Sequence, residues 1–140
     1  MRPDTRLSRV LHVLLHLSEL NAPVTSSVIA QMLGTNGAVV RRMMAGLRDA
    51  GLVTSVKGHG GGWSLARPLD EISLLTVYQA IGSPTLFAMG NDEERPRCLL
   101  ARAANDAADE ALAVARHSFE AVLERASVSD LAAKRAREMR

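Results

Sequence analysis

Hydrophobic residues recur at intervals of three and four along the first part of the chain, a spacing typical of amphipathic helices. The pattern predicts three successive helices over residues 6–20, 25–33 and 36–50. Thr25 can cap the second helix, and Gly34 supplies the flexible residue for a short turn before the third. This order predicts a helix-turn-helix unit preceded by one supporting helix.

After Gly51 the apolar pattern changes to short β-branched and aromatic runs. The runs "LVTSV" and "WSLA" flank a segment with four glycines in positions 58–62, so residues 52–66 are predicted to form a β-hairpin. Such a glycine cluster indicates either a tight turn or a close approach of the backbone to another group. A phosphate-binding loop would need a helix after the glycines and a lysine at its end, whereas here a strand-like run follows and Lys57 precedes them. A hairpin that enters the DNA minor groove and a plain hairpin without a ligand both remain open.

The second half of the chain is predicted to be helical. Ser73 and Gly82 bracket a short helix, a polar loop follows, and residues 97–126 form one long helix free of Gly and Pro. Ser127 opens a short terminal helix that is expected to fray into a basic end. The predicted fold class is mainly α, a winged helix-turn-helix domain with a two-stranded β wing in residues 1–82. Residues 83–140 would form the loop, a long dimerisation helix and the terminal helix.

Composition narrows the class of protein. With 47% hydrophobic and 23% charged residues the chain is expected to fold as a globular protein. Residues 1–70 contain eight of the 17 Lys and Arg but four of the 15 Asp and Glu, a basic balance suited to nucleic acid. The apolar run "VLHVLLHL" is too short to span a membrane and no leader opens the chain, so a cytoplasmic protein without a membrane partner is expected. Only 3% of residues are aromatic, which argues against single-stranded nucleic acid as the ligand.

The outward face of the third predicted helix combines small residues with arginines. A helical wheel centred on Val40 places Arg42 and Ala38 outward and Arg41 to one side. Small side chains allow a helix to approach the major groove closely, and arginine can read guanine or bind phosphate. Asn36 falls at the helix N-terminus, where free N–H groups favour phosphate. The alternative is that these arginines are ordinary solvated charges.

The chain resembles the Rrf2 family of bacterial transcriptional regulators over residues 24–82, which read "VTSSVIAQMLGTNGAVVRRMMAGLRDAGLVTSVKGHGGGWSLARPLDEISLLTVYQAIG". The matching pattern is "LRxAGLV...GxGGGxxLARP...ITLLDV", and "RCLLARAANDAADEAL" fits the long helix of the same family. The resemblance implies that the third helix enters the major groove, the wing enters the minor groove and the long helix forms a homodimer. The residues expected to contact double-stranded DNA are Ser26, Asn36, Gly37, Ala38, Val39, Arg41, Arg42, Lys57, His59 and Gly60.

Cysteine content separates this chain from the iron–sulfur members of that family. Those members carry three cysteines around the start of the long helix, whereas this chain has only Cys98. The chain therefore resembles the branch without a cluster, and no cofactor or metal site is expected. Cys98 is expected in the first turn of the long helix beside Arg95 and Arg97, where an activated thiol could sense an oxidant. A structural role for Cys98, or a small-molecule pocket at Leu86, Phe87 and Met89, is the alternative.

An apolar stripe along the long helix predicts the dimer interface. Its members recur at three and four: Ala104, Ala108, Ala111, Ala115, Phe119 and Val122. Packing of this stripe on the chain's own first helix is the alternative.

Two other classes of function are alternatives to a DNA-binding regulator. A winged-helix module can bind protein instead of DNA, but an apolar third-helix face would then be expected. An enzyme would have to use His12, His16 or His59, and the first two lie one helical turn apart with no carboxylate nearby in sequence. The chain is therefore predicted to be a homodimeric regulator of transcription and not an enzyme. Repression of transcription is favoured over activation. The operator and the signal are left open.

Overall fold

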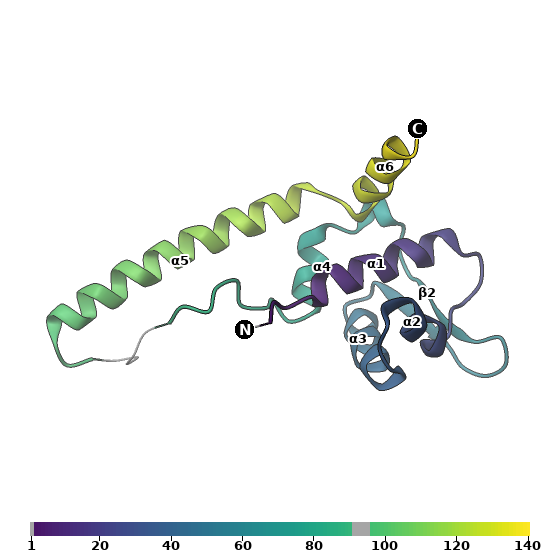
Figure 1. Ribbon diagram of the computed structural model, residues 1–140, viewed down its shortest axis with the longest axis horizontal. Helices are drawn as coiled ribbons and strands as arrows, with labels where there is room; N and C mark the ends of the chain where they lie inside the picture. The colour runs from purple at the N-terminus through teal and green to yellow at the C-terminus, as the bar shows by residue number, and fades with distance from the viewer. Residues whose placement is uncertain (1, 91–95) are drawn as a thin grey trace.

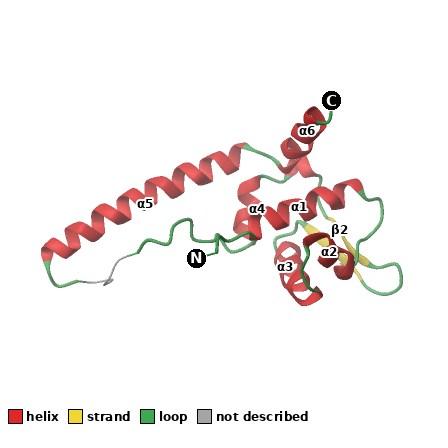
Figure 2. Ribbon diagram, in the orientation of Figure 1, coloured by secondary structure: helices red, strands yellow, loops and turns green. Residues whose placement is uncertain are grey.

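The computed structural model describes residues 2–90 and 96–140 and shows a mainly helical chain with one small sheet (Figure 1, Figure 2). The winged helix-turn-helix fold is confirmed. The elements follow in the order α1 (Arg6–Glu19), α2 (Ser26–Leu33), α3 (Gly37–Asp49), β1 (Val53–Val56), β2 (Gly62–Leu65), a 3-10 turn η1 (Leu69–Glu71), α4 (Leu74–Ala80), α5 (Leu99–Arg125) and α6 (Val128–Glu138). No helix in the described ranges is both long and apolar enough to cross a membrane.

The predicted caps set the ends of the first helices. The Thr25 hydroxyl accepts a hydrogen bond of 3.2 Å from the amide of Val28, which fixes the start of α2. Gly34 ends α2 in the left-handed conformation, with φ of 63°. Asn36, which the sequence pattern placed as the first residue of the third helix, lies just before it, and its side chain caps α3 by accepting a hydrogen bond of 3.1 Å from the amide of Val39. These contacts confirm the helix-turn-helix predicted from the sequence.

The wing is an antiparallel hairpin that pairs Val53 with Leu65 and Val56 with Gly62. On its other edge β2 pairs with Val24, since the amides and carbonyls of Val24 and Trp63 exchange hydrogen bonds of 2.9 and 2.8 Å. A Cβ added at Gly62 would lie 2.6 Å from the Val24 backbone, far inside normal contact distance. This part of the glycine cluster therefore serves the close approach of two backbone segments.

One hydrophobic core lies between α1, α3, the wing and α4. Leu14, Met44, Leu52 and Val77 are fully buried in it. Val128, at the start of α6, is also fully buried in the same core. The terminal helix therefore returns to the domain at the other end of the sequence, and it stays helical to Glu138 instead of fraying early. The predicted division of the chain at residue 82 stays a prediction.

The long helix α5 extends away from the winged domain as an arm (Figure 1). Its 27 residues span about 40 Å at 1.5 Å per residue. Near its C-terminal end α5 packs on α4, where the rings of Tyr78 and Phe119 meet edge to face with centroids 5.3 Å apart. The alternative packing on the first helix is therefore wrong, because α4 occupies that position.

Candidate nucleic-acid interface

The third helix presents its arginines to solvent and its branched and sulfur-containing residues to the core. Val40, Met44 and Leu47 are fully buried, whereas Arg41 and Arg42 are exposed. Ala38 is exposed on the same outward side. The small and basic outer face predicted for this helix is therefore present.

The start of α3 is shaped around Arg41. A Cβ at Gly37 would lie 3.1 Å from Nη1 of Arg41, so glycine leaves room for the guanidinium to lie back over the first turn. Asn36, which is exposed, uses its side-chain oxygen to cap the helix. The positive guanidinium and the positive end of the helix dipole share this corner, an arrangement that favours an anion.

The wing tip carries the remaining predicted contacts. Lys57, His59 and Gly60 are all exposed there. Ser26 lies elsewhere: its hydroxyl accepts a hydrogen bond of 2.9 Å from the indole Nε1 of Trp63. Sequence reasoning missed this contact, although a tryptophan in a half-buried strand signals that its N–H needs a partner.

Val39 is only half-buried and faces the junction of α3 with α1 and α4, where it lines a pocket. Met43 is likewise half-buried and lines the same pocket. Both residues lie between the core side and the outward side of α3.

The predicted dimer stripe divides into two sets on α5. Ala104, Ala111 and Val122 are exposed, whereas Ala108, Ala115 and Phe119 are half-buried. The exposed apolar surface instead continues through Leu100, Ala107 and Val114, at spacings of three and four with the first set. The exposed α5 stripe is defined here as Leu100, Ala104, Ala107, Ala111, Val114 and Val122. Periodicity could not show which face of α5 is covered by α4, and the dimer interface itself stays a prediction.

Cys98 is the N-cap residue of α5 and is exposed. The backbone N–H groups of Ala101 and Leu100 favour the thiolate and hold the pKa of the Cys98 thiol below its usual value. The Cys98 side chain does not accept a capping hydrogen bond from α5. Arg97, next to it, is exposed, and Arg95 lies outside the described residues. The sequence pattern placed Cys98 within the first turn of the helix, whereas α5 begins at Leu99.

The small-molecule pocket considered at the loop before α5 is too small for a ligand. Leu86, Phe87 and Met89 contact α5 at Leu112 and Arg116 around a space of only about 60 Å³. Pockets that hold small molecules are several times larger.

The three histidines named as candidates for catalysis lie on two separate elements. His12 and His16 lie on α1 with their Nε2 atoms 2.9 Å apart, and His59 lies in the wing. Nowhere in the described ranges do three or more His, Cys, Asp or Glu gather as metal ligands. The only cysteine of the chain cannot supply the thiolates of a cluster held by three cysteines. The residues present therefore do not fit such an iron–sulfur group.

Comparison with known proteins identifies relatives over nearly the whole chain. The family model Rrf2, described as an iron-dependent transcriptional regulator, matches residues 4–134. YwnA of Bacillus subtilis, which is named as an HTH-type transcriptional regulator, is 35% identical over 132 residues, covering 94% of this chain and 91% of YwnA. These relatives are regulators of transcription and not enzymes.

Solved structures share the fold. A crystal structure of a protein described as DNA-binding matches with a TM-score of 0.72 and 31% identity, over 90% of this chain and 97% of that one. CymR, the global cysteine regulator of Bacillus subtilis, matches with a TM-score of 0.66 over 96% of this chain and 98% of CymR. At 21% identity the likeness to CymR shows the fold alone.

Proposed function

Because the chain belongs to the Rrf2 family of transcriptional regulators, we propose that it binds a palindromic site on double-stranded DNA as a homodimer, with α3 in the major groove and the wing in the minor groove. The observation that carries the proposal is the outer face of α3, where Arg41 and Arg42 are exposed beside the small residue Ala38. This face can approach base edges closely and offers two cations to guanine or phosphate.

The remaining contacts in this proposal follow from the same geometry. Asn36 and Gly37 bring the helix N-terminus to a backbone phosphate, and Val39 contacts the DNA from the edge of the outer face. Lys57, His59 and Gly60 enter the minor groove at the exposed wing tip. Ser26 acts by holding the wing through Trp63.

The exposed α5 stripe supports the homodimer. Leu100, Val114 and Val122 are 82%, 62% and 56% exposed, an unusual amount of apolar surface on one helix face. Alanines between them allow a second α5 to approach closely. Two copies related by a two-fold axis would present two α3 helices, so the site would be a palindrome.

Repression is the simplest mode of action for such a dimer, because a protein bound across a promoter excludes polymerase from it. A regulator of bacterial genes would act in the cytoplasm, where the chromosome lies. The competing proposal is that the outer face of α3 binds a protein partner in place of DNA. The charge of that face argues against it, because an apolar face would be expected for a protein partner.

The test is selection of duplexes from a random library by the purified protein, followed by fluorescence anisotropy with the enriched duplex. We expect an enriched palindrome, and an affinity that falls steeply with salt because arginines displace counterions. Arg42→Ala should weaken binding about 5- to 150-fold if the side chain reads a base. Lys57→Gln should weaken all duplexes similarly and reduce the salt slope by about one.

The matched control is Lys134→Gln, which removes an exposed charge from α6, on the opposite side of the molecule from α3 (Figure 1). It should bind like wild type. Failure to enrich any sequence, or wild-type affinity for Arg41→Ala, Arg42→Ala and Lys57→Gln alike, would refute the proposed DNA interface.

A further inference from the structure

A pocket of about 370 Å³ lies where α3 meets the start of α1 and the end of α4. Its volume falls within the range of sites that bind small molecules. Val39 and Met43 of α3, together with Ile81 after α4, supply apolar surface to it. The other large side chains that line it are all arginines, Arg6, Arg9 and Arg42. We call this the arginine pocket.

The pocket lies on the helix proposed to read DNA. Val39, Arg42, Met43 and Gly46 follow at intervals of three and four, which places them on one face of α3. At Gly46 the missing side chain keeps α3 close to α4, since even a Cβ there would lie 3.4 Å from the carbonyl oxygen of Ala80. The base of the pocket is therefore formed by two closely packed helices.

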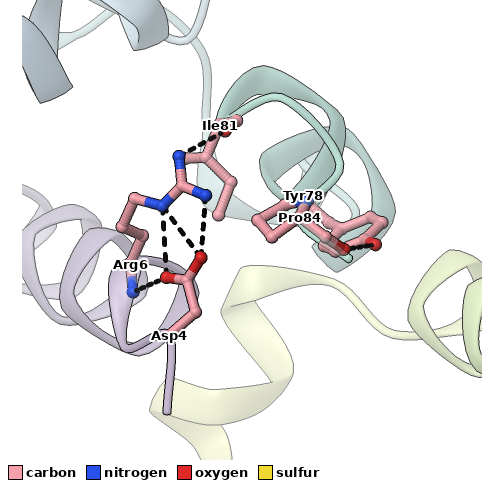
Figure 3. A network of polar contacts seen from close by, with 5 residues as sticks. All are labelled: Asp4, Arg6, Tyr78, Ile81 and Pro84. Atoms are coloured by element: carbon pink, nitrogen blue, oxygen red, sulfur yellow. Dashed lines mark hydrogen bonds and ion pairs between the residues drawn. The ribbon is translucent and has the colours of Figure 1, made fainter. Parts of the chain in front are cut away.

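Arg6 is fixed in place by neighbouring groups (Figure 3). Its Nη2 donates to Asp4 at 2.7 Å, and its Nε donates to both carboxylate oxygens of Asp4 at 3.1 Å. Nη1 donates to the carbonyl of Ile81 at 3.3 Å, the negative end of α4. Arg6 therefore joins α1 to α4 and forms a wall of the pocket whose charge Asp4 balances.

Arg9 and Arg42 have no such partner. Within residues 2–90 and 96–140 neither of them forms an ion pair or a side-chain hydrogen bond. These two positive charges, which have no partner within those ranges, thus adjoin the apolar surface of Val39, Met43 and Ile81. A phosphate group alone would satisfy the arginines but leave this apolar surface exposed to water, whereas an organic anion would cover both.

We propose that the arginine pocket binds a small organic carboxylic acid with an apolar body, and that this ligand competes with DNA for Arg42. The carboxylate pairs with Arg9 and Arg42, and the apolar body covers Val39, Met43 and Ile81. The binding step stands on the pocket itself, while the competition rests on the proposed DNA interface. A ligand here would release the regulator from DNA by occupying the helix that reads it.

Methyl NMR of the full chain labelled at methionine tests the binding step, because Met43 lines the arginine pocket and Met89 and Met139 lie elsewhere. The probe is 1-naphthoate, and 1-naphthalenemethanol is its neutral counterpart. We expect naphthoate to shift the Met43 signal saturably and to leave Met89 and Met139 unchanged. The alcohol should bind at least tenfold more weakly.

Arg9→Gln should weaken naphthoate binding at least fivefold, and Arg116→Gln, beside the small space at Met89, should leave it unchanged. Equal affinity for acid and alcohol, a shift at Met89 in place of Met43, or unchanged binding in Arg9→Gln would each overturn the proposal.

Anisotropy with the selected duplex tests the competition. Naphthoate at ten times its dissociation constant should lower DNA affinity about tenfold, as expected for mutually exclusive ligands. Without naphthoate, Arg9→Gln should bind DNA within twofold of wild type. A loss as large as that of Arg42→Ala would make Arg9 a DNA phosphate contact and overturn the assignment, as would full DNA affinity at saturating naphthoate. If no duplex is bound at all, the proposed function fails, and the NMR titration still decides the pocket.

Discussion

The indole Nε1 of Trp63 in the wing donates a hydrogen bond of 2.9 Å to the hydroxyl of Ser26 at the start of α2. The indole is only 8% exposed, so its N–H depends on a partner within the protein. The paired backbone bonds between Val24 and Trp63 lie beside this contact. Together they hold the wing against the helix-turn-helix, and thereby set the relative position of the two surfaces proposed to contact DNA.

Ser26→Ala should lower the free energy of unfolding by about 1 to 2 kcal/mol, because it leaves a nearly buried indole N–H without an acceptor. Urea denaturation measures this change. The matched control is Ser27→Ala, since Ser27 is exposed on the same turn. We expect it to change stability by less than about 0.5 kcal/mol.

The same variant distinguishes two roles of Ser26 in DNA binding. If Ser26 acts by positioning the wing, Ser26→Ala and Lys57→Gln should weaken DNA binding by less than the sum of their separate effects. Additive losses in a double-mutant cycle, measured by anisotropy, would show instead that Ser26 contacts the DNA independently of the wing.

Gly62→Ala should destabilise the fold by about 3 kcal/mol, because its Cβ would overlap the Val24 backbone and its φ of 144° strains an L-residue. Gly60→Ala offers the comparison. Gly60 has φ of 73° with nothing near its missing Cβ, so only the left-handed conformation is penalised, by about 1 to 2 kcal/mol. If Gly62→Ala and Gly60→Ala lowered the free energy of unfolding equally in urea denaturation, the close approach of Gly62 to the Val24 backbone would not contribute to stability.

Val114→Asp should weaken the dimer at least tenfold, because it places a charge in the middle of the exposed α5 stripe. Sedimentation equilibrium measures the dissociation constant, and circular dichroism should show an unchanged fold. The control is Ala113→Asp, which adds the same charge at an exposed position on the far side of α5. A dimer equally stable in both variants, or a wild type that is monomeric at micromolar concentration, would contradict the proposed interface.

Phe119→Ala should destabilise the monomer, because the Phe119 ring packs against Tyr78 within the same chain. We expect a loss of about 2 kcal/mol in unfolding free energy, less than for a fully buried phenylalanine because Phe119 is half-buried. The dimer dissociation constant, measured where the variant is folded, should change less than in Val114→Asp. The opposite order of effects would place Phe119 in the dimer interface, as the sequence alone suggested.

Cys98 should react with iodoacetamide with a pH midpoint below the value of about 8.5 for an ordinary thiol. The amides of Ala101 and Leu100 favour its thiolate and lower the pKa in the folded state. The thiolate therefore stabilises the start of α5 fully above the unfolded-state pKa, and this contribution is lost as the pH falls through the lowered folded-state pKa. A midpoint at or above the ordinary value would contradict this.

We further propose that oxidation of Cys98 alters DNA binding, because the residue lies at the start of the helix that carries the dimer stripe. Peroxide should change the affinity of wild type for the selected duplex and leave Cys98→Ser unaffected. An equal response of the two proteins, or none in wild type, would remove Cys98 as a sensor.

The sequence by itself determined the local elements. Thr25, Ser73 and Ser127 are the predicted capping residues, and each accepts a hydrogen bond from the amide three positions later. Gly34 takes the left-handed conformation expected of it. These features depend on residues close together in the chain, so spacing and residue type suffice to predict them. The exposed arginines of α3 followed from the same helical periodicity.

Contacts between distant segments were decided only by the tertiary structure. Apolar periodicity predicts that a face of α5 is covered, but α4 decides which face, and so Phe119 packs inward while Val114 remains exposed. Trp63 and Ser26 meet across 37 positions of sequence, and the arginine pocket joins three helices. The physical reason is that side-chain pairing across a fold depends on how helices and strands are placed, and neither local propensity nor periodicity carries that information.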